Sequence, residues 1–277
     1  MQREAFQLVE PSPWPLIGSL SALRVTAGFV RWFFGLGIFS LLWRFFLVIL
    51  TIINWWRDVI RESLFIGYHT SFVKNLIRSS IIFFIVSEVM FFFSFFWGYF
   101  HRSLSPRPDL GGVWPPTGVS SLDAFGIPLL GTVILLTSSG ILTFGHHRTL
   151  IEEGLVFSSS KFEFWNSRNC SLEGIFLSVV LGILFLKVQL REYQDTRYFI
   201  RRSVYGSIFF LATGFHGLHV ILGVLFLGVI FLRILSFHFS VSHHVGFEGR
   251  VWYWHFVDVV WLFLFIIVYW WGNRFFY

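Results

Sequence analysis

The sequence predicts an all-α integral membrane protein with seven transmembrane helices. Hydrophobic residue types make up 55% of its 277 residues and aromatic types 21%. Charged residues make up 13%, against about 25% in an ordinary soluble domain. Apolar runs near the roughly 20 residues that a helix needs to cross a bilayer recur along the whole chain. These observations exclude a water-soluble globular protein and leave no room for a sizeable domain outside the membrane.

The seven predicted helices differ in how strongly the sequence marks them. Residues 14–34 and 38–56 are apolar apart from three arginines, and Gly35 and Gly37 between them predict a helical hairpin within residues 14–66. Four runs with at most one charge follow, at residues 79–100, 124–145, 203–232 and 251–273. The weakest candidate, 174–186, needs extension to Tyr193, with Lys187 and Arg191 reaching the interface by their long side chains.

The connections carry most of the net charge of +6, so nucleic acid is not needed as a partner. Residues 103–123, rich in Pro and Gly, predict an ordered surface loop, and residues 146–169 predict a solvated excursion. Lys and Arg number ten on each face of a seven-span arrangement that omits Arg24, so charge does not give the orientation. An odd number of spans places the termini on opposite sides. The N-terminus lacks a basic n-region, so the sequence predicts neither a cleaved signal nor a transit peptide.

Glu88 is the first candidate functional residue, because it lies in the middle of an apolar span. A charged acid there costs at least about 2.5–3.5 kcal/mol. The sequence leaves two interpretations equally open: a carboxyl that locks two helices together, or one that handles protons. Its neighbours on the same helix offer no side-chain hydrogen bond, so its partner must come from another helix, and His216 and His219 are the best candidates.

The histidines favour packing over metal binding. His216 and His219 share one helical face, and no second histidine pair lies within a predicted span, so we expect no metal or haem site. The single Cys170 excludes thiolate clusters and a disulfide framework. His255 and Asp258, also three residues apart, predict a hydrogen-bonded pair within one helix, with a proton relay as the alternative.

Seven stretches together resemble the cytochrome c oxidase subunit III family, in the family's order and over nearly the whole chain. The combination is far more specific than any single motif. The stretches are residues 11–16 (PSPWPL), 55–63 (WWRDVIRES), 87–92 (SEVMFF), 111–118 (GGVWPPTG), 213–220 (TGFHGLHV), 243–248 (HHVGFE) and 252–263 (WYWHFVDVVWLF).

The resemblance implies a two-helix and a five-helix bundle (residues 72–277) separated by a lipid-filled cleft. It also implies a multi-pass protein of the mitochondrial inner membrane with its N-terminus on the matrix side. Such a subunit binds no haem or copper itself, packs mainly against subunit I of the oxidase, contacts subunit II and accessory subunits, and supports proton uptake; haem a and copper lie in the partner subunits. Structural phospholipids are implied at Trp56, Arg61, Glu62, His69, Arg78, Arg233 and His238.

Departures from the family pattern are concentrated in three places. The 44 residues between His147 and Glu192 exceed the usual length, which predicts a matrix-side insertion near residues 158–169. Residues 194–202 replace the family's pattern with Asp-Thr-Arg and Arg-Arg. Arg24 interrupts the first span and is expected to pair with a lipid phosphate or a polar group in the cleft. The alternative functions are a stand-alone proton-coupled transporter, which predicts internal repeats that the sequence lacks, and a haem-binding electron carrier.

Overall fold

The computed structural model describes residues 11–35, 37–108, 111–155, 161–201, 203–239 and 244–273. Within these ranges the regular secondary structure is helical, with no strand. The α-helices are α1 (Trp14–Phe33), α2 (Phe39–Arg61), α3 (Ser71–Ser103), α4 (Ile127–Leu155), α5 (Lys161–Asp195), α6 (Val204–Leu235) and α7 (Val245–Leu264). Two π-helical segments, Glu62–Ile66 and Phe265–Trp270, continue α2 and α7. The predicted all-α class is therefore confirmed.

Six helical segments of the described chain are long and apolar enough to cross a membrane: Phe39–Ile66, Ser71–Ser103, Ile127–Arg148, Arg168–Asp195, Val204–Leu235 and Val245–Trp270. The prediction of seven spans is thus supported for six. The first helix, α1, falls short because Arg24 and Arg31 interrupt its apolar sequence. The segment predicted as weakest forms part of α5, 35 residues long.

The solvated excursion predicted at residues 146–169 is helical over most of its length, and residues 149–167 lie between the spans Ile127–Arg148 and Arg168–Asp195. Helix α4 continues to Leu155 and α5 begins at Lys161, so only the short connection between them, residues 156–160, lies outside the described residues, together with the start of the predicted insertion. The segment contains no proline, and its Leu, Glu and Lys residues favour a helix. Charges there mark the ends of spans and not the ends of helices.

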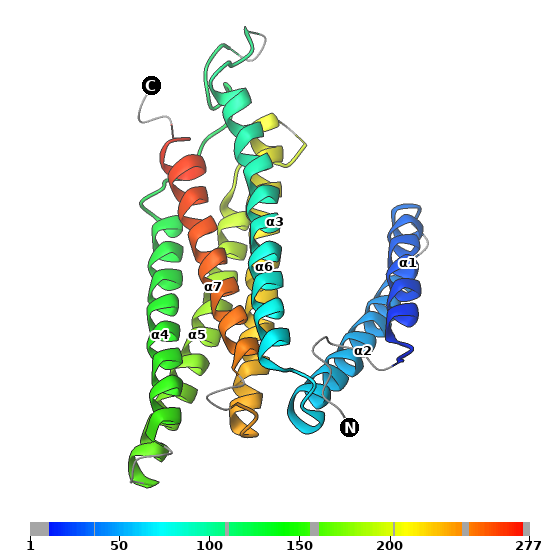
Figure 1. Cartoon of the computed structure of the whole chain (residues 1–277). Coiled ribbons are helices and arrows are strands. Elements are labelled where there is room, and N and C mark those ends of the chain that lie inside the picture. The colour runs from blue at the N-terminus through cyan, green and yellow to red at the C-terminus, as the bar shows by residue number, and fades with distance from the viewer. Residues whose placement is uncertain are drawn as a thin grey trace. The chain divides into compact units, whose positions relative to one another are not determined.

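The chain divides into two compact units, Met1–Ile77 and Arg78–Tyr277, and the boundary falls inside α3. In the first unit α1 packs against α2 as a hairpin (Figure 1), and Gly35 and Gly37 at its turn have positive φ values of 76° and 83°. The predicted glycine turn is confirmed. At the other end of the hairpin, Nε1 of Trp14 donates to Oδ2 of Asp58 at 2.5 Å.

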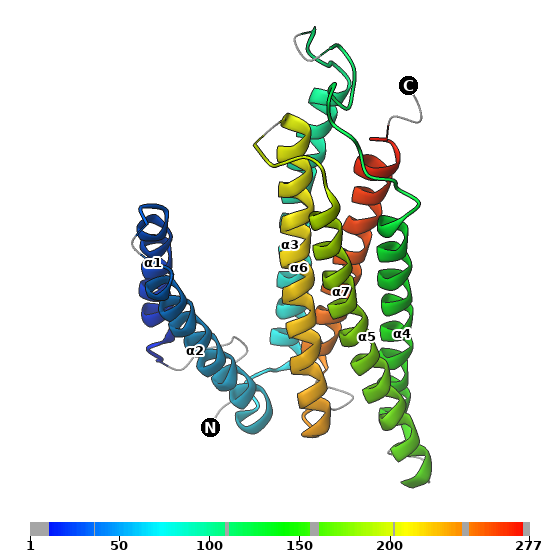
Figure 2. The same ribbon diagram turned by 180° about the vertical axis from the view of Figure 1, so that it is seen from behind.

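The second unit is a helical bundle in which α4 pairs with α5, α5 with α6, and α7 packs between α4 and α6 (Figures 1 and 2). In its core, large aromatic rings pack directly against glycine residues of neighbouring helices. A Cβ atom on Gly182 or Gly223 would lie 2.7 Å from the ring of Trp254, which is 1% exposed. Such close approaches are typical of helices packed within a membrane.

Candidate functional site

Glu88 on α3 and His219 on α6 form a hydrogen-bonded pair inside the second unit. Nε2 of His219 lies 2.7 Å from Oε2 of Glu88, and the side chains are 12% and 23% exposed. Of the two histidines predicted as partners of this carboxyl, His219 is the one that the structure places against it.

The geometry of His219 limits the pair to two protonation states. Its Nδ1 lies 2.7 Å from the backbone carbonyl oxygen of Phe215, and because a carbonyl oxygen only accepts, Nδ1 must carry a hydrogen. The bond to Glu88 then holds one further proton. Either the carboxyl donates to a neutral imidazole, or an imidazolium donates to a carboxylate. The pair can therefore move one proton between its members without losing the hydrogen bond.

Aromatic rings surround this pair. The Phe92 ring meets the imidazole of His219 edge-on with centroids 5.0 Å apart, and the Tyr253 ring lies nearly parallel to it at 6.3 Å. Phe91 and Phe256 approach the same imidazole from α3 and α7. Because these rings offer no carboxylate or amide to the pair, Glu88 and His219 satisfy each other in apolar surroundings.

His216 does not reach Glu88. Its Nε2 lies 3.1 Å from the backbone carbonyl oxygen of Val257 on α7, and the residue is 1% exposed. The rings of Trp261 and Phe185 pack against its imidazole. The two histidines are three residues apart on α6, slightly less than one full turn, so their side chains point in different directions. His219 faces α3 and His216 faces α7.

The hydrogen bond predicted between His255 and Asp258 is absent from the interactions of the described residues. Nε2 of His255 lies instead 3.2 Å from Oγ1 of Thr143 on α4, and Oδ1 of Asp258 is buried with no hydrogen-bond partner there. Both side chains lie on the face of α7 toward α4. The sequence pattern within α7 could not predict that hydroxyl groups of α4 would be their neighbours. In the described residues, no group of three or more His, Cys, Asp or Glu side chains has the geometry of a metal site.

Arg78, predicted to contact lipid, forms an ion pair. Its Nε lies 2.8 Å from Oε2 of Glu248 near the start of α7, and its Nη2 lies 3.2 Å from Oε1 of the same carboxylate. Nε2 of His244 approaches Oε1 of Glu248 at 3.0 Å. The sequence pattern does not indicate this partner, because 170 residues separate Glu248 from Arg78. The bidentate pair joins the beginning of α3 to the beginning of α7.

Arg233 and Arg250 form a second cluster, at the C-terminal end of α6 and the first turns of α7. Nη1 of each lies 3.2 Å from the point where a Cβ atom on Gly246 would stand, so the two guanidinium groups are neighbours. Nη1 of Arg250 donates to the Gly246 carbonyl at 2.8 Å, and Arg233 lies over the ring of Phe239. Nε of Arg233 is buried without a hydrogen-bond partner, and no carboxylate among the described residues pairs with either arginine. Arg250 was not predicted as a site residue, since in the sequence a lone arginine beside a span resembles an ordinary snorkelling residue.

His238 follows Arg233 outside the membrane-spanning segments. Burial, and next the positive charge of Arg233, lower the pKa of His238 below its ordinary value. The smaller part of this shift comes from the positive charge of Arg233. A bound anion beside Arg233 would offset that part of the shift.

The other four predicted lipid contacts lie in the first unit. A pocket of about 280 Å³ brings Arg61 and Glu62 together with Trp14, Trp55 and Asp58. Glu62 is 7% exposed, whereas Trp56 is 40% exposed. Trp56 and His69 do not line this pocket, so the structure groups only two of the four. The polar Trp14 and Asp58 in its wall were not predicted.

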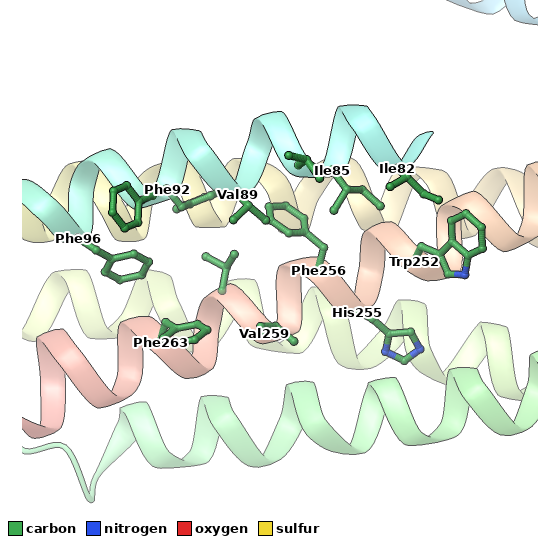
Figure 3. Close-up of a pocket in the computed structure, with 13 residues that line it drawn as sticks. Ile82, Ile85, Val89, Phe92, Phe96, Trp252, His255, Phe256, Val259 and Phe263 are labelled. Atoms are coloured by element: carbon green, nitrogen blue, oxygen red, sulfur yellow. The ribbon is translucent and has the colours of Figure 1, made fainter. Parts of the chain in front are cut away.

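An apolar groove of about 610 Å³ runs between α3 and α7. Figure 3 shows Ile82, Val89 and Phe96 of α3 opposite Trp252 and Phe263 of α7. His255 is the one ionisable side chain among the residues that line it. The groove offers hydrocarbon contact and no constellation for chemistry.

Comparison with known proteins identifies the family to which these features belong. A family model described as cytochrome c oxidase subunit III matches residues 4–273. Cytochrome c oxidase subunit 3 of Patiria pectinifera is 50% identical over 268 residues, covering 97% of this chain and 98% of the relative. That of Equus caballus is 50% identical over 272 residues, covering 98% and 99%, and that of Paracentrotus lividus is 49% identical over 268 residues, covering 97% of each. The chain belongs to the cytochrome c oxidase subunit III family.

Proposed function

We propose that this chain acts as a core subunit of the terminal respiratory oxidase, in which electrons pass from cytochrome c to oxygen and protons are pumped. The observation that carries this function is the relation to cytochrome c oxidase subunit 3 over nearly the full length of both chains. The transporter alternative has no support from these relatives.

Within the oxidase we propose a supporting role without a redox centre of its own. The chain then packs mainly against subunit I, contacts subunit II and accessory subunits, and leaves haem a and copper to those partners. We place it in the mitochondrial inner membrane with the N-terminus on the matrix side, its two-helix and five-helix bundles separated by a cleft that holds phospholipid. The Glu88–His219 pair supports proton uptake in this proposal, because it exchanges one proton within a single hydrogen bond.

Copurification tests the assignment to the oxidase directly. When the chain is isolated from its native membrane in a mild detergent, we expect the visible absorption of haem a and stoichiometric copper to accompany it. A second isolation through a tag on subunit I should recover this chain in equal amount. A colourless particle that contains this chain alone would contradict the assignment.

Lipid binding rests on the cluster of Arg233 and Arg250. Two neighbouring guanidinium groups repel each other, and no described carboxylate compensates for them. A phosphate oxygen between them would offset the repulsion and accept from the unpartnered Nε of Arg233. The site lies at the end of a span, where the headgroups of a bilayer lie.

Replacing Arg250 with glutamine is expected to lower retention of anionic phospholipid at this site about tenfold or more, because a hydrogen bond to a charged group contributes about 1.5–3 kcal/mol. The measurement is mass spectrometry of lipids that remain bound to the purified complex after detergent washing. Arg191→Gln is the matched control, since Arg191 is 70% exposed and pairs with Asp195 at the other end of the bundle. Equal lipid retention by the two variants would refute the assignment of this site.

A further inference from the structure

A second basic pocket lies where α3 ends and α6 begins, at the opposite end of α6 from Arg233. Its volume is about 100 Å³, and its lining includes Arg102, Ser105, Arg107, Trp114 and Val204. Arg102 belongs to the last turn of α3, and Arg107 and Trp114 to the loop that follows it. From Val204 to Arg233 the chain rises about 44 Å along α6, so the two basic sites are separate.

The charge of this pocket is positive from two sources. Arg102 is half-buried and Arg107 exposed, and neither forms an ion pair or hydrogen bond with another described residue. Guanidinium groups only donate hydrogen bonds, so an acceptor is what they lack. The N-terminus of α6 adds the positive end of a 32-residue helix at Val204.

Other polar groups in and beside the wall of the pocket already have hydrogen-bond partners. Nε1 of Trp114 donates to Oη of Tyr99 at 3.1 Å, and the rings of these two residues are in edge contact. Oγ of Ser203 caps α6 by accepting from the Gly206 amide at 3.0 Å. The polar groups of the pocket left for a ligand are therefore the two arginines and the hydroxyl of Ser105.

The surroundings indicate a lipid and not a free ion. Both α3 and α6 are apolar enough to span a membrane, and the pocket lies at their ends, at the level of the headgroups. Leu104 is 71% exposed and Val113 43%, and in the α5–α6 connection Phe199 is 64% exposed between Arg197 and Arg201. Basic residues interspersed with exposed apolar side chains at a membrane boundary are typical of contact with anionic lipid.

We propose that Arg102 and Arg107 bind the phosphate of an anionic phospholipid in this pocket. The headgroup lies between the end of α3 and the start of α6, its phosphate oxygens accept from the two guanidinium groups, and the acyl chains extend along the apolar faces of these helices. This site goes beyond the lipid contacts of the proposed function, because it uses arginines that none of those contacts include.

The test uses the complex that contains this chain, reconstituted in phosphatidylcholine discs. Spin-labelled phosphatidylglycerol is titrated in, and the fraction immobilised by the protein is measured. We expect Arg102→Gln and Arg107→Gln each to reduce the affinity about fivefold, following the contribution of about 1 kcal/mol per basic residue near an anionic surface. The Lys variants at both positions should restore most of the binding.

Two results would overturn the proposal. The first is equal immobilisation by the double Gln variant, the double Lys variant and the parent complex. The second is full displacement of the lipid by inorganic phosphate at millimolar concentration, which would assign the pocket to a free anion. Because the readout is lipid immobilisation in a complex whose haem spectrum is recorded beforehand, failure here leaves the oxidase assignment intact.

Discussion

Replacing Gly174 with valine is expected to separate α4 from α5 and to lower the free energy of unfolding of the second unit by about 3 kcal/mol or more. A Cβ atom on Gly174 would lie 3.2 Å from Cα of Gly145 and 3.2 Å from the carbonyl oxygen of Ile141. Both are backbone atoms of α4, so neither can move away as a flexible side chain would. The two further methyl groups of valine make the overlap worse.

Hydrogen bonds between the same helices would be lost with this contact. Oγ of Ser178 donates to the carbonyl of Ser138 at 3.1 Å, and Oγ of Ser138 donates back to the carbonyl of Ser178 at 3.3 Å. One turn away from Gly174, Oγ of Ser171 donates to the carbonyl of Gly145 at 3.0 Å. Helices in a membrane gain little from the hydrophobic effect on association, so close packing of small residues and such bonds hold the pair together.

Thermal unfolding of the purified complex and its yield of assembled subunits measure this effect. Gly140→Val is the matched control: it makes the same change in α4, where a Cβ atom meets nothing within 4 Å. We expect the control to unfold near the temperature of the parent and Gly174→Val to unfold well below it. Similar unfolding temperatures for the two variants would show that α4 and α5 are not packed through these residues.

This contact also shows why the sequence understated α5. The charge-free length of a segment predicts a span well, as α4 and α6 demonstrate, but Lys187 and Glu173 shorten that length without ending the helix. The small residues that face α4 become informative only when the partner helix is known. For α1 the sequence predicted the helix correctly. Its arginines nevertheless keep its hydropathy below that of the other six segments.

The candidate site was predictable where one helix determines it and not where two helices meet. Spacing placed His216 and His219 on neighbouring parts of one span and left their partners open; the crossing of α3 and α7 over α6 assigns Glu88 to His219 and the Val257 carbonyl to His216. The neighbourhood of Arg233 and Arg250 likewise arises only when the connection after α6 returns α7 beside it. Side-chain partners across helices depend on rotation about each axis, which hydropathy does not encode.

Glu88 itself carries the second large expected effect. Glu88→Leu would leave Nε2 of His219 without its partner among aromatic rings, at a cost of about 1–3 kcal/mol for an unsatisfied buried polar group. Glu88→Gln is expected to remain close to the parent in stability, because its side-chain amide can donate to Nε2 while Nδ1 keeps its bond to Phe215. The glutamine variant therefore keeps the hydrogen bond and removes the exchangeable proton.

Comparing the two variants separates the structural role of the pair from its proton chemistry. If Glu88 only locks α3 to α6, Glu88→Gln keeps both the unfolding temperature and the rate of proton uptake. Glu88→Leu then lowers the unfolding temperature without changing the rate of proton uptake. If the pair handles protons, Glu88→Gln keeps the unfolding temperature but slows proton uptake by the reconstituted oxidase. Infrared spectra assign the resting state, since a carboxylic acid band that disappears in Glu88→Gln places the proton on the carboxyl and a carboxylate band places it on His219. Equal stability of Glu88→Leu and Glu88→Gln would contradict the hydrogen bond from which both roles follow.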